Sequence, residues 1–168
     1  ASGHGRAAVH PGGDPSATRE SISEEELRGL VSSHEALGSD ERELINDIFT
    51  AGDRRLREVL VPRTEVQFLD TATTVAQAWR AVGDGPHSRY PVVRGSHDDV
   101  VGFVHIRDLV RTRTTGDTPG VRVGDVVRPV ALLPDGLNVL AALSQMRRAI
   151  AHLAIVVDEY GGAVGICT

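Results

Sequence analysis

The stretch SRYPVVRGSHDDVVGFVHIRDL, residues 88–109, decides the fold of this 168-residue chain. Its two apolar runs, Tyr90 to Val93 and Val100 to Val104, have the length and the β-branched content of buried strands. The polar residues between them, Ser96 to Asp99, predict a turn. Apolar side chains at helical spacing then predict a helix over Arg107 to Arg113. The stretch therefore predicts a strand, a turn, a second strand and a helix.

The chain repeats this pattern at an offset of 64 residues, and one residue fewer in the last turn aligns Gly102 with Gly165. The matching apolar positions are Val66 with Val130, Leu69 with Leu133, Val75 with Val139, Ala78 with Ala142, Val92 with Val156 and Val93 with Val157. Each copy predicts a short strand, an amphipathic helix, a strand, a turn and a strand. The remaining predicted elements are Val66 to Leu69, Thr74 to Val82, Val130 to Leu133, Leu137 to Arg148, Leu153 to Val157, a turn at Gly161-Gly162, and Ala163 to Cys167.

Two β-α-β-β-α units of this size cannot bury their sheets alone, so we expect them to pack sheet against sheet about a pseudo-twofold axis. The predicted fold class is α/β (α+β), with short helices ahead of the repeats. Ser23 and Glu26 form a capping box for a helix over about 24–33. Ser39 can cap a second helix that ends near Gly52, and a third covers about 54–60. Residues 1–20 lack periodicity and predict a disordered linker.

The composition excludes several classes of protein. The net charge is −5 and only 4% of the residues are aromatic, which argues against a nucleic-acid partner. All 18 basic residues are Arg, so a P-loop or Schiff-base lysine is ruled out. The single cysteine, Cys167, cannot form an internal disulfide. Because the chain begins with Ala1 and stops directly after an apolar run, we expect a segment of a longer protein.

No motif predicts a catalytic or metal site. Asp158 and Glu159 are adjacent, and neighbours on a strand point to opposite faces, so a turn or dimer-contact role is favoured over a hydrolase. His105 and Asp108 have no third ligand nearby in the sequence, which disfavours a metal. The chain also lacks a Ser-His-Asp order and a His-Glu-x-x-His motif.

Four motifs together resemble a known family. They are Val61-Pro62-Arg63-Thr64, Ser88-Arg89-Tyr90-Pro91-Val92, Val101-Gly102-Phe103-Val104 with Arg107-Asp108-Leu109, and Val157-Asp158-Glu159-Tyr160-Gly161-Gly162. Over about residues 23–168 the chain is similar to a pair of CBS (cystathionine-β-synthase) domains, a Bateman module, of the CorC/cyclin-M branch. This resemblance implies a role in magnesium or cobalt transport, and some relatives are called hemolysins. The expected domains are a linker (1–20), a helical connector (21–60), a first CBS repeat (61–122), and a second (123–168) that stops before its C-terminal helix.

The resemblance implies an adenine-nucleotide site between the repeats. CBS repeats carry a glycine, a hydroxyl residue and an aspartate around the third strand. The first copy has Gly102, His105 in place of the hydroxyl, and Asp108. The second has Gly165 and Thr168, and ends before its aspartate. One of the two possible sites is therefore expected to be incomplete, with at most one nucleotide bound per chain.

The expected nucleotide-binding residues are Arg63, Thr64, Val66, Ser88, Arg89, His105, Asp108, Val130 and Thr168. A carboxylate in the first turn of a helix, such as Asp108, can accept ribose hydroxyls, or can simply favour the helix dipole. The two arginines suit phosphate, with surface ion pairs as the alternative. The hydroxyls of Thr64 and Ser88 can contact a ligand or satisfy local backbone. The two valines would flank the adenine or belong to the core.

We therefore expect a regulatory module, without catalytic residues, at the cytoplasmic face of a bacterial membrane. It would bind ATP or AMP, with Mg²⁺ offsetting the triphosphate charge. Its expected partners are a second copy and the membrane domain of the same full-length chain. The helix positions expected to form the homodimer face are Val75, Ala78, Trp79, Val82, Leu140, Leu143 and Met146. The alternative is a purely structural dimerisation module, whose nucleotide site is degenerate because His105 replaces the hydroxyl.

Overall fold

The computed structural model describes residues 22–115 and 120–168. The predicted linker over residues 1–20 lies outside the described residues. The chain divides into two compact units, residues 1–47 and residues 48–168. Both copies of the repeat lie in the second unit.

Two helices precede the repeats, α1 (Glu24–Ser33) and α2 (Ser39–Gly52). Helix α1 begins at the predicted capping box, in which the Ser23 hydroxyl accepts the Glu26 N–H and the Glu26 carboxylate accepts the Ser23 N–H, both at 3.2 Å. No residue of either helix is buried. Among the described residues, no helix combines the length and apolarity needed to cross a membrane.

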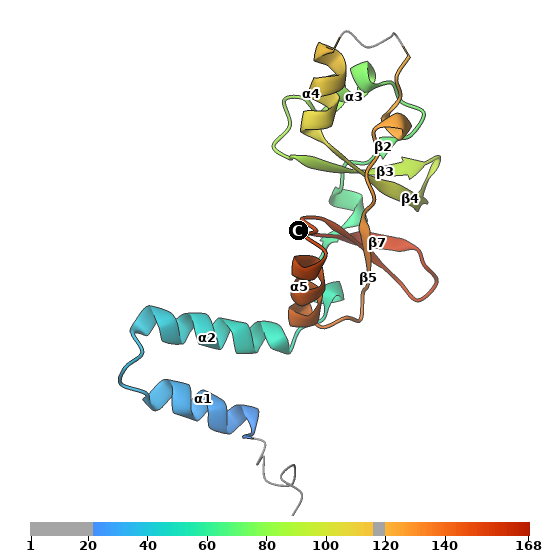
Figure 1. The fold of residues 1–168 in the computed structure, drawn as a ribbon. Helices are drawn as coiled ribbons and strands as arrows, with labels where there is room; N and C mark the ends of the chain where they lie inside the picture. The colour runs from blue at the N-terminus through green and yellow to red at the C-terminus, as the bar shows by residue number, and fades with distance from the viewer. Residues whose placement is uncertain (1–21, 116–119) are drawn as a thin grey trace, which may run out of the picture. The chain divides into compact units, whose positions relative to one another are not determined.

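The second unit holds two sheets, one for each repeat (Figure 1). The strand order is β2-β3-β4 in the first sheet and β1-β7-β6-β5 in the second. The strands are β1 (Val61–Pro62), β2 (Leu69–Asp70), β3 (Arg89–Arg94), β4 (Ser96–His105), β5 (Ala131–Pro134), β6 (Ala154–Val157) and β7 (Ala163–Cys167). The helices are α3 (Val75–Val82), α4 (Ile106–Thr114) and α5 (Val139–Arg148). Figure 1 shows α3 and α4 on one side of the first sheet and the second sheet on its other side.

Strand pairing confirms the repeat. In each copy the first and second strands are parallel and the second and third are antiparallel. The partners correspond one to one: Leu69 lies opposite Val92 as Leu133 lies opposite Val156, and Val92 opposite Gly102 as Val156 opposite Gly165. Thr74 and Asn138 cap the corresponding helices α3 and α5. The predicted α+β class is therefore correct.

The predicted turn at residues 96–99 is wrong, because these residues begin strand β4. The chain reverses instead at Gly95, which has a φ of 74°. Glycine adopts this positive φ without a steric clash because it has no Cβ. Residues 96–99 are exposed, so their polarity reflects a solvent-facing strand end. The predicted strand over 66–69 is also mostly wrong, since only Leu69 pairs and residues 63–65 form a 3₁₀ turn.

Each repeat is completed by a segment that lies at or just before the start of the other repeat. We call residues 54–60 and 121–127 the leading segments. The first places Leu56, 2% exposed, in the core of the second repeat, and the second places Val123, 0% exposed, in the core of the first. The Leu56 N–H donates to the Leu137 carbonyl and the Val123 N–H to the Thr73 carbonyl, each at 2.9 Å. The two repeats therefore exchange core residues.

This exchange explains why the predicted helix over 54–60 is wrong. Only a 3₁₀ turn forms there, at Leu56–Glu58. The N–H groups of Leu56 and Arg57 bond to carbonyls of the second repeat, at Leu137 and Asp135, instead of to their own segment. In an α-helix over 54–60 these N–H groups would point along the helix axis instead of toward the second repeat.

Most of the expected dimer face is wrong as well. Val75, Ala78 and Val82 are at most 3% exposed because α3 packs them against its own sheet. Met146 is likewise buried in the second core. Trp79 and Leu140 are partly buried, and Leu143 of α5 has 52% of its surface exposed. An amphipathic helix buries its apolar face within its own unit first.

The exchange predicts that Leu56→Ala destabilises the second repeat although Leu56 precedes the first. We expect a loss of about 2–5 kcal/mol in the free energy of unfolding, the usual cost of truncating a buried leucine. Val59→Ala is the control, since Val59 lies in the same segment and is 40% exposed. Urea unfolding of both variants measures the difference, and equal small losses would contradict the exchange.

Candidate functional site

Two cavities lie in the second unit and are related by the repeat. The first, of about 470 Å³, is lined by Val61, Glu65, Val66, Gln67, Pro86, His87, Ser88, Arg89, Tyr90, Pro91, His152, Leu153, Ile166 and Thr168. We call it the Thr168 cavity. Four of the predicted nucleotide-binding residues lie on its wall: Val66, Ser88, Arg89 and Thr168. Its lining combines apolar surface with a few polar groups, as in small-molecule sites.

The second cavity, of about 680 Å³, is lined by Arg89, Phe103, Arg128, Pro129, Val130, Ala131, Ala149, Ile150, Ala151, His152 and Leu153. We call it the Arg128 cavity. Most of its residues are the counterparts of Thr168-cavity residues at the offset of 64, such as Val130 for Val66 and His152 for Ser88. The two predicted valines therefore lie on equivalent walls of two different cavities.

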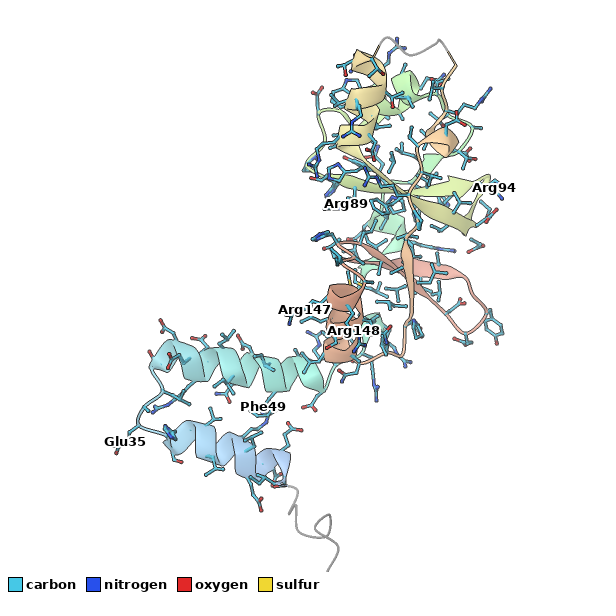
Figure 2. All side chains as sticks on the ribbon, in the orientation of Figure 1. Glu35, Phe49, Arg89, Arg94, Arg147 and Arg148 are labelled. Atoms are coloured by element: carbon cyan, nitrogen blue, oxygen red, sulfur yellow. The ribbon has the colours of Figure 1, made fainter. Side chains whose placement is uncertain are left out.

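Arg89 lines both cavities. It begins β3 and pairs with His105 at the end of β4. Figure 2 shows Arg89 at one end of β3 and Arg94 at the other. Burial lowers the pKa of His105, and the charges of Arg107 and Arg89 lower it further. His105 is therefore neutral near pH 7, and its Nδ1 accepts the Arg107 N–H at 3.1 Å to cap α4.

Asp108, in the first turn of α4, is bound by Arg128, which is not among the residues predicted from the sequence. Arg128 Nε donates to Asp108 Oδ2 and Arg128 Nη2 donates to Asp108 Oδ1, both at 2.7 Å. The hydrogen bonds from Arg128 hold the pKa of Asp108 below its usual value, although burial opposes them. Asp108 and Arg128 also line a smaller cavity of about 240 Å³ with Arg111, Thr112 and Val126.

A signal for Arg128 was present in the sequence. At the repeat offset of 64, Arg128 is the counterpart of Thr64, one of the predicted nucleotide-binding residues. Carrying each site residue of the first copy over to the second would have found it. The backbone pairing of Arg128 with β4 also explains why its side chain reaches Asp108. The Arg128 N–H donates to the Phe103 carbonyl at 2.7 Å. Phe103 lies on β4, five residues before Asp108.

Arg63 and Thr64 are not brought to either cavity. Both are exposed in the 3₁₀ turn over residues 63–65. Arg63 Nη1 donates to Asp98 Oδ1 at 3.0 Å and to the Ala163 carbonyl at 3.4 Å. The surface ion pair that the sequence left as an alternative is thus the contact that Arg63 makes in this structure.

The comparison with family models now identifies the fold. The model of the CBS domain matches residues 56–114 and residues 123–168. The chain belongs to the CBS domain family. The CBS domain of the bacterial CNNM/CorC family Mg²⁺ transporter has a TM-score of 0.80 and 31% sequence identity, over 88% of this chain and 91% of that one. This places the CBS pair in the CorC/CNNM branch.

Two further relatives bear on the site. The CBS domain of the CNNM/CorC transporter in complex with ATP has a TM-score of 0.72 and 31% identity, over 77% of this chain and 91% of that one. A UPF0053 protein of Mycobacterium tuberculosis is 40% identical over 150 residues, which cover 86% of this chain and 34% of that protein. The CBS pair thus spans about a third of the length of this curated relative.

The remaining candidate groups of this CBS pair have structural partners. Asp158 Oδ1 accepts the N–H groups of Tyr160 and Gly162, at 2.9 and 2.8 Å, and so fixes the turn between β6 and β7. This is the turn role that the sequence favoured. Cys167 lies in β7 against Met146, and burial raises the pKa of its thiol. Within residues 22–115 and 120–168, no three His, Cys, Asp or Glu side chains are grouped to hold a metal ion.

The lowered pKa of Asp108 predicts an acid-dependent contribution to stability. A carboxylate with a lowered folded pKa stabilises the fold above its unfolded pKa, about 3.9, and loses this effect as the pH falls through the folded value. We therefore expect Asp108→Asn to lower the free energy of unfolding at neutral pH, and the deficit to shrink progressively below about pH 4.

Urea unfolding at a series of pH values measures this deficit. Asp98→Asn is the matched control, because Asp98 pairs with Arg63 while 66% of its side chain is exposed. Exposed pairs of this kind contribute about 0–1 kcal/mol. A deficit for Asp108→Asn that is the same in acid as at neutral pH would contradict the assignment.

Proposed function

We propose that this chain is the cytosolic regulatory CBS pair of a CorC-like membrane ion transporter and that it binds adenine nucleotide between its repeats. Nucleotide binding would change how two CBS pairs meet, and so pass a signal to the membrane domain of the same full-length protein. The observation that carries the proposal is the position of Arg89, which lines both cavities beside a neutral His105.

The charges and shapes of the cavities support a nucleotide. The cavities of about 470 and 680 Å³ fall within the range of roughly 300–1,000 Å³ that is usual for small-molecule sites. Arginine binds phosphate with two parallel N–H groups, and Val66 and Val130 provide apolar walls of the kind a base packs against. The similarity to a CBS domain in complex with ATP points to the same class of ligand.

Arg89→Ala is expected to weaken ATP more than adenosine, because only the phosphate contact is lost. The expected loss is about 1.5–3 kcal/mol, the value of one charge-assisted hydrogen bond, or roughly 10- to 100-fold in affinity. Arg94→Ala is the matched control, since Arg94 is an exposed arginine at the far end of the same strand. Calorimetric titration of ATP, AMP and adenosine, with and without Mg²⁺, measures the effect.

If Arg89→Ala and Arg94→Ala bind ATP with equal affinity, Arg89 does not contact the nucleotide. The absence of heat and of a thermal shift with millimolar ATP, ADP or AMP, also in a chain extended beyond Thr168, would favour the structural alternative. In that case the module would only dimerise. A stoichiometry of at most one nucleotide per chain is expected.

We also propose that the CBS pair forms a homodimer, through exposed helix residues that differ in part from the predicted ones. The large apolar side chains exposed on or next to α3, α4 and α5 are Val110, Leu143 and Ile150, with 38%, 52% and 81% of their surfaces exposed. Helix faces of this kind are candidates for burial against a second copy.

The dimer predicts a mass near twice that of the 17.9 kDa chain in light scattering at micromolar concentration. Leu143→Glu is expected to return the monomer mass, because it would bury a carboxylate in the interface. Leu132→Glu should not, since Leu132 is also exposed, at 58%, but lies on β5 rather than on a helix. A monomer mass for the unmodified chain would refute the dimer.

A further inference from the structure

The ion pair between Asp108 and Arg128 is unequal in its exposure to solvent. Only 12% of the Asp108 side chain is exposed, whereas 52% of the Arg128 side chain is. Arg128 also lines two cavities, the Arg128 cavity and the smaller one that Asp108 lines. Arg128 can therefore leave the carboxylate without burying its own charge.

Asp108, in contrast, cannot lose its partner without replacement. Both of its carboxylate oxygens accept hydrogen bonds from Arg128. Among the described residues, no other side chain donates to this carboxylate within hydrogen-bond distance. A buried carboxylate left without donors is costly. The pair should open only when a ligand brings new donors to Asp108, and ribose hydroxyls are donors of this kind.

A free nucleoside would gain little by opening the pair. Its ribose would replace the bonds that Arg128 makes to Asp108, but the released guanidinium would find no new anion. A nucleotide differs because its phosphate offers Arg128 an anion with the same bidentate geometry as a carboxylate. The cost of opening the pair is then offset by a second charge-assisted contact.

We propose that Arg128 makes the site selective for phosphorylated ligands by exchanging partners: it binds Asp108 in the free chain and moves to a ligand phosphate when a nucleotide enters. This inference rests on the proposed nucleotide function and adds a named specificity-determining residue to it. A nucleotide thus displaces Arg128 from Asp108, whereas a nucleoside does not.

The test compares adenosine, AMP and ATP by calorimetry on the 168-residue chain, on Arg128→Ala and on Arg111→Ala. Arg128→Ala frees Asp108, so we expect adenosine to bind about two- to five-fold more tightly, the equivalent of a half-exposed ion pair. ATP should bind about tenfold more weakly or worse, because its phosphate contact is lost. Arg111→Ala is the control: Arg111 lines the same small cavity but is not the arginine that donates to the carboxylate. It should leave adenosine binding unchanged.

A second readout follows Arg128 in the unmodified chain, and its only variant, Arg128→Lys, keeps the positive charge. The Nε–H resonance of Arg128, assigned by its absence in Arg128→Lys, should shift with AMP or ATP and stay in place with adenosine. If ATP binds the unmodified chain while this resonance does not move, or if adenosine binds Arg128→Ala no better, the exchange is refuted and the nucleotide function stands. If ATP does not bind the unmodified chain at all, both fail together.

Discussion

The structure depends on the exchange of leading segments between the two repeats. Residues 54–60 supply Leu56 to the second core, and residues 121–127 supply Val123 to the first. Two glycines permit this close approach. A Cβ at Gly102 would collide with the Arg128 carbonyl, and one at Gly165 would collide with the Val61 carbonyl. Without this contact neither repeat would have a complete core.

The same backbone crossing builds the chemistry of the site. Because Arg128 pairs with Phe103 on β4, the edge strand of the first sheet, its side chain reaches Asp108 at the start of α4. The two cavities are equivalent by position but not by charge. Where the first copy has Thr64 the second has Arg128, and where the second has Thr168 the first has His105. The repeated fold therefore has two cavities with different lining residues, and Arg89 lines both.

Under the proposed exchange, a ligand would act on the CBS pair through helix α4. Asp108 lies in the first turn of this helix, and Val110, one of the exposed apolar residues proposed for the dimer face, lies two residues later. A nucleotide that replaces Arg128 at Asp108 would therefore change contacts on the same helix that presents an apolar residue to a second copy. This gives the regulatory proposal a short physical route between ligand and dimer.

The sequence by itself determined the repeat, because identical spacing of valines and leucines requires identical strand pairing, and the structure has Leu69 opposite Val92 as it has Leu133 opposite Val156. It also determined the capping box of α1, which consists of local hydrogen bonds. Only the tertiary structure decided that Leu56 belongs to the other repeat, that α3 buries its apolar face within the chain, and that Asp108 is held by Arg128. These depend on contacts between residues far apart in the chain, and local patterns of polarity contain no information about which distant partner a side chain meets.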